Sequence, residues 1–427
     1  MSVALVDFNL WISTARCFII GSMNGTVKIL HLADLHLGAS AYEKPGRPRL
    51  AEFLASVDRA WELAFDEDVD AILVAGDVFD GYRPDAEVER EWAARVSRLL
   101  DAGVPLAIVL GNHDAPARRG AASHLDVYDR LQLESVHVFS LPGVKTLATK
   151  SGPLQVVGVP WPFRGKFFES GESTVPADAD ITDRVEGILD DIILPELDPE
   201  VPTALLAHLW LREGSLSSEK TFAVGPDPII PASAVVRDEF AYAALGHLHR
   251  HQEVPGTDGR AVYAGGLCRI SFGDEAVPKG VVIAEVSTGA SSWRFVEFPS
   301  RTFKTVAVEV ETAEESEGKI AESAGSFDPA DAVVRLIVRG PAAVLSELTR
   351  AELAAYFPGA FAFKAEFERT DERRAARPSI AEDATVAAAL EQYAADHRPP
   401  KGVKKEEVIT AATELERRAE EEGGGSG

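Results

Sequence analysis

The sequence predicts a layered α/β fold, because short apolar runs alternate with amphipathic segments and polar residues separate them. This alternation extends from Val27 to about Phe298. The chain has 427 residues, which is too long for one compact core and indicates two or three units. A hydrophobic share of 46% with 26% charged residues is ordinary for a folded protein, so the composition excludes wholesale disorder.

Strands are expected where a short apolar run is bounded by polar or turn residues. These runs are Val27–His31, Ala71–Ala75, Leu106–Leu110, Gln155–Val159, Ala204–Ala207, Tyr242–Leu245, Ala261–Ala264 and Val281–Val286. Leu50–Phe65 and Glu87–Leu100 carry apolar residues at three- and four-residue spacing, which predicts helices that cover a sheet. The segment Ala121–Leu133 could cover a sheet in the same way, or offer an apolar face to a second subunit.

A smaller α/β unit is expected over residues 300–371, after the main unit of residues 27–299. Its pattern alternates strand, helix, strand, helix and strand over Thr305–Val310, Glu315–Ala324, Ala332–Val338, Ala343–Tyr356 and Phe361–Glu368. Residues 372–427 follow as a linker, a helix over Ile380–Asp396, a proline-glycine break, a charged helix over Lys404–Glu422 and a flexible glycine-rich tail. Two helices joined by a short turn predict a helical hairpin.

The N-terminal residues 1–26 are expected to be a non-native or disordered extension. The only methionines are Met1 and Met23, and the first strand-like run begins shortly after the second, so Met23 is the expected native start. The two cysteines, Cys17 and Cys268, suggest neither a disulfide framework nor a zinc site, which fits a reducing compartment. With no apolar stretch of about 18 residues or more, we expect a cytoplasmic protein without a membrane span.

A net charge of −25 is unusual for a protein that binds nucleic acid, because phosphate binding normally uses lysine and arginine clusters. Bound divalent ions would add positive charge locally, and some basic residues could form a rim around them. Each of these could equally be an ordinary solvated surface charge: Arg118, Arg119, Arg164, Lys166, Lys220, Arg250 and Arg269.

Five short polar motifs each follow an apolar run. They are Asp34-Leu35-His36, Gly76-Asp77-Val78-Phe79-Asp80, Gly111-Asn112-His113-Asp114, Ala207-His208 and Gly246-His247-Leu248-His249. Side chains at the carboxyl ends of neighbouring strands converge on one crevice of an open α/β sheet. The order of the motifs therefore predicts one metal site with the candidate ligands Asp34, His36, Asp77, Asn112, His208, His247 and His249.

The residue types indicate which metal the site would take. Carboxylate and amide oxygens with imidazole nitrogens, and without thiolates, suit Mn²⁺, Fe or Mg²⁺ better than structural zinc. A bridging carboxylate can hold two ions roughly 3.5 to 4 Å apart, and Asp77 is the natural bridge. We therefore expect two divalent ions, with Mn²⁺ first and Mg²⁺ or Fe as alternatives.

Each motif alone is a weak signal. Asp-x-His is common by chance, a lone histidine such as His208 is usually a core or surface residue, and a Gly-Asp pair after a strand is usually a turn. The joint occurrence of the motifs is what favours the metal site over these structural explanations.

Together the motifs resemble the calcineurin-like metallophosphoesterase superfamily, and within it the SbcD-type DNA-repair nucleases. The resemblance covers about Lys28 to Phe298, and it continues less specifically through the smaller unit, which resembles the capping domain of that family. The run from His31 to Gly38 is similar to the opening motif of the nucleases. Gly81 after Asp80, and Asp114 after His113, differ from the pattern of the protein Ser/Thr phosphatases.

The resemblance implies a layered metallophosphoesterase sandwich and specific roles for the site residues. Asp34, His36, Asp77 and His249 would bind one ion, and Asp77, Asn112, His208 and His247 the other. His113 would contact the scissile phosphate or protonate the leaving group, and Asp114 would hold its ring. Asp80 stands where some relatives carry histidine, so no second phosphate-contacting imidazole is expected there.

The family also implies a function and partners. The chain would be the nuclease subunit of an SbcCD-like bacterial DNA-repair complex, acting as a double-strand exonuclease and single-strand endonuclease. It would form a homodimer, and its C-terminal hairpin would bind an SbcC-like coiled-coil ATPase. An apolar stripe of Val386, Leu390 and Tyr393 could serve that contact or pack on the chain's own capping domain.

Two other functions remain open from the sequence. The same metal site could act on small phosphodiesters or phosphoproteins, which the acidic charge favours and the additional domains disfavour. A non-catalytic scaffold for repair partners would be expected to lack some metal-ligand residues, but this sequence has a ligand-type residue at all seven positions.

Overall fold

The computed structural model describes residues 25–43, 48–115, 121–162, 178–217 and 227–370. Residues 1–24 of the expected N-terminal extension (1–26) and the expected C-terminal hairpin lie outside the described residues. The chain divides into two compact units. One contains the described residues up to Thr305 together with Asp328–Arg335 and Phe357–Lys364; the other contains Val306–Phe327, Leu336–Tyr356 and the residues from Ala365.

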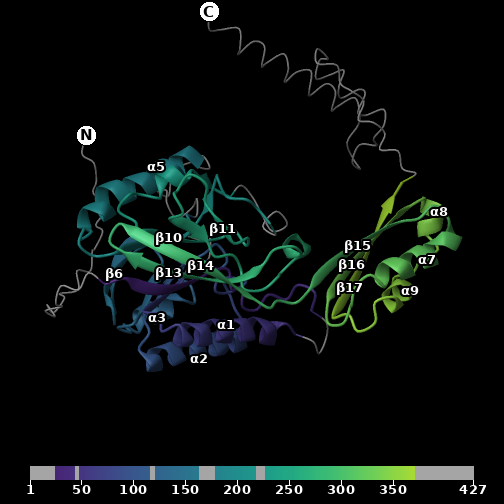
Figure 1. Ribbon diagram of the computed structural model, residues 1–427, viewed down its shortest axis with the longest axis horizontal. Coiled ribbons are helices and arrows are strands. Elements are labelled where there is room, and N and C mark those ends of the chain that lie inside the picture. The colour runs from purple at the N-terminus through teal and green to yellow at the C-terminus, as the bar shows by residue number, and fades with distance from the viewer. Residues whose placement is uncertain (1–24, 44–47, 116–120, 163–177, 218–226, 371–427) are drawn as a thin grey trace, which may run out of the picture. The chain divides into compact units, whose positions relative to one another are not determined.

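Two six-stranded sheets form the centre of the larger unit (Figure 1). The first sheet has the order β14-β13-β1-β2-β3-β4, with β1 (Val27–Leu32), β2 (Ala71–Val74), β3 (Leu106–Val109), β4 (Val136–Phe139), β13 (Lys279–Ser287) and β14 (Ala290–Phe298). The second has the order β11-β12-β10-β7-β6-β5, with β5 (Gly143–Thr149), β6 (Gly152–Val159), β7 (Thr203–His208), β10 (Tyr242–Gly246), β11 (Gln252–Glu253) and β12 (Ala261–Tyr263).

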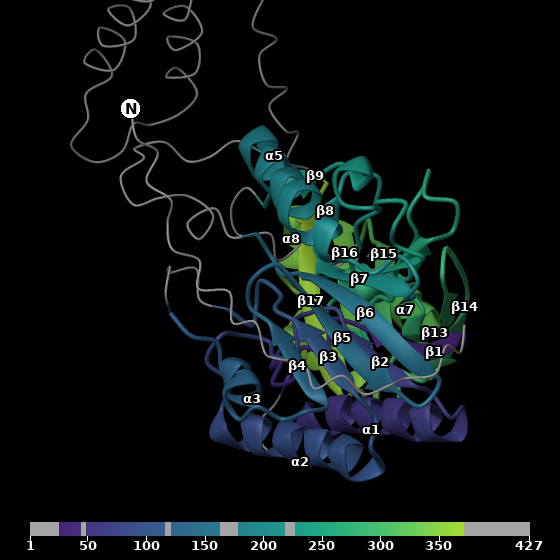
Figure 2. The same cartoon turned by 90° about the vertical axis from the view of Figure 1, so that its left-hand side faces the viewer.

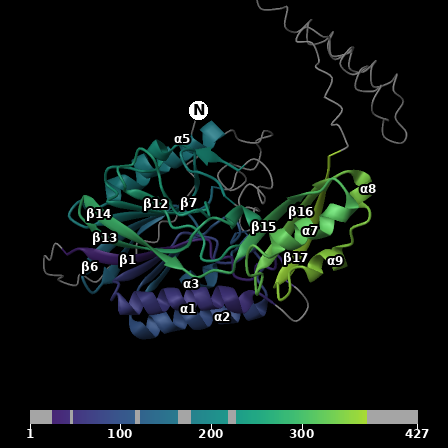
Figure 3. The same cartoon turned by 45° about the vertical axis from the view of Figure 1, so that its right-hand side comes forward.

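The apolar core has three layers, which explains why most strands are apolar on both faces. Ile29, Leu73 and Leu206 belong to the layer between the sheets. Helices α1 (Leu50–Asp66) and α2 (Ala86–Ala102) pack on the first sheet, where Trp61 and Trp92 are fully buried. Helix α5 (Asp178–Ile188) packs on the second sheet, on the side opposite α1 and α2 (Figures 1, 2 and 3). The layered α/β prediction is therefore confirmed.

Parallel pairing positions the loops that carry the polar motifs. Strands β1 to β4 run parallel to one another in the first sheet. In the second sheet, β6, β7, β10 and β12 are also parallel neighbours. The carboxyl ends of neighbouring parallel strands lie at one edge of each sheet, so the residues that follow them are brought together.

The predicted strands and the first two helices are confirmed, whereas several edge elements were not predicted. These are β4, β5, β11, β14, α5 and the two-stranded pair β8 (Trp210–Leu211) and β9 (Ile229–Ile230). The predicted segment Ala121–Leu133 contains only the short helix α3 (Asp126–Arg130). Ser123 marks where this helix begins, since its hydroxyl accepts the Leu125 N–H at 3.2 Å and its own N–H donates to the Asp126 carboxylate at 2.8 Å.

A three-stranded sheet follows, with the order β15 (Phe303–Glu309), β16 (Val333–Gly340) and β17 (Ala362–Arg369). Its connections contain α7 (Ala313–Ala324), α8 (Ala342–Leu345) and α9 (Arg350–Ala355). The single helix predicted over Ala343–Tyr356 is wrong, because Thr349 starts a new helix. The Thr349 hydroxyl accepts the Glu352 N–H at 3.3 Å, and the Glu352 carboxylate accepts the Thr349 N–H at 3.2 Å, which is a capping box.

Among the described residues, no helix combines the length and the apolarity that a membrane span requires.

We predict that Thr349→Ala lowers the free energy of unfolding of this region by about 1 kcal/mol, because the Glu352 N–H loses its side-chain acceptor. Thr349→Ser keeps the oxygen and is the matched control, which should unfold like the parent chain. Urea unfolding followed by circular dichroism measures the difference. Equal midpoints for the alanine and serine variants would contradict the capping role.

Candidate metal centre

The seven candidate ligands come from loops at the carboxyl ends of parallel strands in both sheets. Two follow β1, one follows β2, one follows β3, one ends β7 and two follow β10, in the order Asp34, His36, Asp77, Asn112, His208, His247 and His249. Six of them are buried, at 5% exposure or less, and Asn112 is half-buried. The structure thus brings together the residues that the sequence singled out.

Asp77 lies at the middle of this group. Its Oδ2 atom is 3.4 Å from His208 Nε2 and 3.8 Å from His36 Nε2. Its other oxygen, Oδ1, accepts the His113 backbone N–H at 2.8 Å, which fixes the orientation of the carboxylate. Asp77 Oδ2 therefore faces both halves of the candidate centre, as a bridging ligand must.

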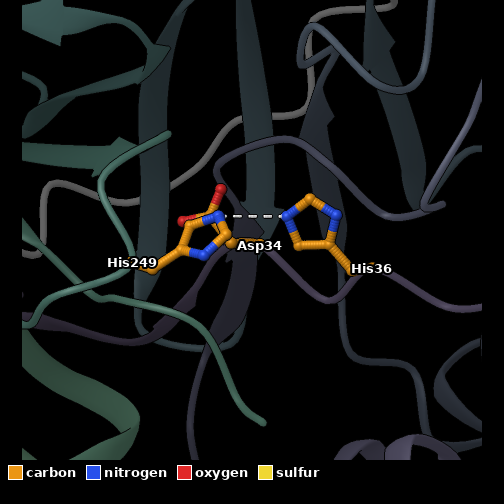
Figure 4. A group of neighbouring side chains, drawn as sticks. All are labelled: Asp34, His36 and His249. Atoms are coloured by element: carbon orange, nitrogen blue, oxygen red, sulfur yellow. Dashed lines mark hydrogen bonds between the residues drawn. The ribbon is translucent and has the colours of Figure 1, made fainter. Parts of the chain in front are cut away.

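The first half contains Asp34, His36 and His249, whose ligand atoms all lie within 4.8 Å of one another (Figure 4). The two Nε2 atoms of His36 and His249 face each other at 3.1 Å. Both oxygens of Asp34 accept the His247 backbone N–H, at 3.0 and 3.3 Å. Two imidazole nitrogens and a carboxylate converging in a buried space are a donor set that fits one divalent cation.

The second half is centred on the amide oxygen of Asn112. Asn112 Oδ1 lies 2.9 Å from His208 Nε2 and 3.2 Å from His247 Nδ1. His208 Nδ1 donates to the Ala75 carbonyl oxygen at 2.8 Å, and this bond leaves Nε2 as the atom that can bind a metal. Trp161 packs against the His247 ring, with ring centroids 4.5 Å apart, and so restricts its rotation.

One unsatisfied atom also indicates that these residues suit a bound cation. Within the described part of the chain, His247 Nε2 is buried and has no hydrogen-bond partner. Together with the converging oxygen and nitrogen donors, this supports a fit between the residues present and divalent ions.

The electrostatics of the centre are those of buried groups held close together. Burial alone would lower the pKa of His36 and His208, but neighbouring carboxylates, including Asp80 beside His36 and Asp77 beside both, raise each pKa to about 9. Burial raises the pKa of Asp34 to about 7, a value to which the nearby charge of Asp77 contributes.

The pKa values of the other two histidine ligands proposed from the sequence, His247 and His249, shift in the opposite direction. Burial holds the pKa of His247 and of His249 well below the usual range for histidine, and the positive charges of neighbouring histidines lower it further. Both rings are therefore neutral at pH 7. Neutral imidazole is the form that binds metals.

The backbone at the centre is held in unusual conformations. Asp34, His36, Asp77 and His247 all have positive φ, at 52°, 44°, 51° and 99°. Residues other than glycine rarely adopt such angles, and they cluster at functional sites. The loops are therefore shaped to aim these side chains inward.

Two glycines beside the ligands allow the loops to approach each other. A Cβ at Gly111 would lie 2.0 Å from Asp77 Oδ1, and a Cβ at Gly246 would lie 1.8 Å from the Ala75 carbonyl oxygen. Both contacts are with polar atoms that the centre or its backbone requires. A side chain at either position would therefore displace the Asp77 or the His247 loop.

Asp114 does not hold the His113 ring, contrary to what the resemblance implies. His113 Nδ1 lies 2.8 Å from the Asp80 carbonyl oxygen, which orients the ring. The Asp114 carboxylate instead accepts the backbone N–H groups of Phe79 and Gly111, each at 3.0 Å. Asp114 therefore joins the loops after β2 and β3. The half-buried His113 ring has a ligand atom within 4.8 Å of those of His36 and Asp77.

Asp80 is a functional candidate that the sequence did not assign to the centre. Its Oδ1 lies 3.2 Å from His36 Nδ1, so the carboxylate holds the ring with Nε2 directed at His249. A carboxylate behind a metal-binding histidine commonly fixes its tautomer. Its signal in the sequence is an acidic residue three positions after Asp77.

The expected basic rim is only partly described. Arg250 is exposed, as a rim residue must be. Arg269 is not part of a rim, because its side chain donates to the carbonyl oxygens of Asp274, Ser300 and Arg301 at 3.0 to 3.2 Å. The other residues of the expected rim lie outside the described residues.

Comparison with known proteins gives one family and several relatives. The model of the family described as calcineurin-like phosphoesterase matches residues 27–251, a range that contains the whole candidate centre. The SbcD subunit of the nuclease SbcCD of Bacillus subtilis (strain 168) is 28% identical over 289 residues, which cover 63% of this chain and 69% of that protein.

Two further relatives extend this similarity. The SbcD subunit of the nuclease SbcCD of Rhodobacter capsulatus is 31% identical over 288 residues, covering 62% of this chain and 68% of that protein. DNA double-strand break repair protein Mre11 of Haloferax volcanii is 27% identical over 325 residues, covering 75% of this chain and 64% of that protein.

We predict that divalent-ion binding releases protons and strengthens as the pH rises from 7 towards 9. His36 and His208, each with a pKa of about 9, carry protons at pH 7, and an ion that binds their nitrogens must displace these protons. Below pH 7 binding should weaken further, because the pKa of Asp34 is about 7.

Titration calorimetry with Mn²⁺ in two buffers of different ionisation enthalpy measures the proton release. The same titrations at several pH values give the slope of affinity. A dissociation constant that does not change between pH 6.5 and 9 would contradict the prediction.

Proposed function

This chain belongs to the calcineurin-like phosphoesterase family, and on that premise we propose that it is a DNA-repair nuclease that hydrolyses phosphodiester bonds with two divalent ions. The observation that carries the proposal is the position of Asp77 Oδ2 between His36 and His208. A shared carboxylate between two ligand groups is the arrangement that a two-metal hydrolase needs.

The proposed ligand sets follow the two halves of the centre. One ion would be held by Asp34, His36, Asp77 and His249, and the other by Asp77, Asn112, His208 and His247. Mn²⁺ is the proposed metal, because the donors are oxygens and imidazole nitrogens without thiolates. When bound, such ions supply charge neutralisation at the phosphoryl oxygens and lower the pKa of the attacking water.

His113 is the proposed general acid. The His113 Nδ1 atom donates a hydrogen bond to the Asp80 carbonyl oxygen. Its other ring nitrogen, Nε2, is therefore the atom that would reach the leaving oxygen of the phosphodiester. Its half-buried position, beside a centre whose other histidines are buried, suits contact with substrate. The chain's own contribution is to hold this imidazole in place and to deliver its proton.

DNA as substrate and an SbcC-like coiled-coil ATPase as partner are proposed from the relatives, two of which are named as subunits of the SbcCD nuclease. The capping domain over residues 300–371 and the ATPase-binding hairpin over residues 372–427 belong to the same proposal. A double-strand exonuclease activity with single-strand endonuclease activity would follow.

A homodimer through α2 and α3 is also proposed. Val127 and Leu131 on and beside α3 are 50% and 60% exposed, which is unusual for such apolar side chains. Val127 also lines a hollow of about 530 Å³, whose other lining residues include Glu89 of α2 and Tyr128 of α3. An exposed apolar side chain such as Leu131 near a hollow is suited to a self-complementary contact.

The substrate test compares two phosphodiesters with the same metal-loaded chain. We expect Mn²⁺-dependent cleavage of a labelled DNA duplex and, more slowly, of bis-p-nitrophenyl phosphate. Cleavage of the small ester without cleavage of DNA would favour a phosphoesterase for small substrates and overturn the nuclease proposal.

We predict that Asp77→Asn removes metal binding and hydrolysis together, because the shared ligand loses its charge. Metal content after dialysis and hydrolysis of both substrates are the measurements. Asp58→Asn, on α1 in a surface ion pair with Arg95, is the matched control and should keep both. Full metal content in Asp77→Asn would remove the support for a bridging role.

We predict that His113→Gln keeps both ions and loses roughly 10² to 10⁴ in rate, because it removes the proton donor and leaves the proposed ligands intact. His137→Gln, which changes a half-buried histidine on β4, is the control and should retain the parent rate. An unchanged rate for His113→Gln with both ions bound would exclude the general-acid role.

A further inference from the structure

A buried ion pair, separate from the proposed ligands, lies directly behind the centre. Lys279 begins β13, Asp274 ends the short helix Phe272–Asp274, and both side chains are 0% exposed. Lys279 Nζ is 2.9 Å from Asp274 Oδ1. Of the lysines that the structure describes, Lys279 is the only buried one. Removing an ammonium group and a carboxylate from water is costly, so a pair at this depth is weak evidence for a purely stabilising role.

The second contact of Lys279 is with a proposed metal ligand. Lys279 Nζ donates to the backbone carbonyl oxygen of His249 at 3.0 Å. The Gly266 N–H donates to the same oxygen at 3.3 Å. The His249 backbone is therefore held from two sides, one of them a charge-assisted hydrogen bond, which is stronger than a neutral one.

The ion pair is itself fixed in place. Asp274 Oδ2 accepts the Ile270 N–H at 3.1 Å, and the Asp274 carbonyl oxygen accepts Arg269 Nε at 3.0 Å. Lys279 is additionally anchored through β13, where its backbone pairs with Phe298 of β14. The donor to His249 therefore comes from a rigid strand and not from a loop.

We propose that Lys279, held by Asp274, is a positioning residue that fixes His249 and thereby sets the ion affinity of the half of the centre formed by Asp34, His36 and His249. His249 follows β10 in a loop, and a shift of its backbone would move the imidazole away from His36 Nε2, now 3.1 Å distant. Loss of such supporting contacts typically costs 10- to 100-fold in metal affinity. This inference rests on the proposed function, because it takes His249 as a ligand.

The test separates positioning from stability by removing both charges at once. Lys279→Met alone would leave the Asp274 carboxylate buried without its partner, so the double variant K279M/D274N carries the test. We expect its metal-free melting temperature to stay near that of the parent chain, while one of the two Mn²⁺ ions binds roughly 10- to 100-fold more weakly. The other ion should keep its affinity.

Titration calorimetry gives the two affinities, and electron paramagnetic resonance of Mn²⁺ reports loss of the coupled pair of ions. The matched control is R95M/D58N, which removes an ion pair between α1 and α2 and should change neither affinity. Unchanged affinities for both ions in the folded K279M/D274N variant would overturn the proposal. So would an equal weakening of both ions, which indicates a general structural role.

His249→Ala distinguishes this inference from the proposed function. If His249→Ala weakens one ion and K279M/D274N does not, the positioning role fails while the ligand assignment stands. If His249→Ala leaves both affinities unchanged, His249 is not a ligand, and the metal assignment fails independently of Lys279.

Discussion

The structure of the centre depends on the orientation of one carboxylate, that of Asp77. Its Oδ1 is fixed by the His113 backbone N–H, so its Oδ2 faces His36 on one side and His208 on the other. His36 follows β1 of the first sheet, and His208 ends β7 of the second. A single side chain thus ties together the loops of two sheets, and the apolar layer between those sheets provides the rigidity that keeps its two oxygens in place.

This arrangement carries a cost that the rest of the fold must offset. Two carboxylates and several imidazoles are buried together, and four of the loop residues have positive φ. The offset comes from polar contacts to the candidate ligands and to the loops that carry them. The Asp80 carboxylate contacts His36, the Lys279 ammonium contacts the His249 carbonyl, and the Asp114 carboxylate joins the Phe79 and Gly111 backbones. The centre is therefore held by a second set of polar contacts as well as by the apolar core.

The sequence was sufficient for the features that depend on local pattern. Apolar runs located the central strands, and the polar residues directly after them located the candidate ligands, because parallel strands end at one edge. Edge elements such as β14 were missed, since their half-exposed residues dilute the pattern. The supporting contacts could not be predicted, because Asp114 meets Phe79 across 35 residues and Lys279 meets His249 across 30. The sequence contained a sign that α8 and α9 are separate helices, the capping box of Thr349 and Glu352. Helical spacing of apolar residues across this segment nevertheless suggested one continuous helix.

The acidic charge of the chain gives the metal centre a role beyond the reaction itself. A net charge of −25 opposes a polyanionic substrate, although such repulsion is screened beyond about 8 Å at physiological ionic strength. Among the described basic residues, Lys279 and Arg269 do not relieve it, because their side chains donate to atoms of the protein itself, whereas Arg250 is exposed. Under the proposed function, the bound ions would then supply positive charge at the scissile phosphate that Lys279 and Arg269 do not. Substrate binding and ion binding are consequently coupled, and a chain without its ions would be expected to lose affinity for DNA as well as catalytic rate.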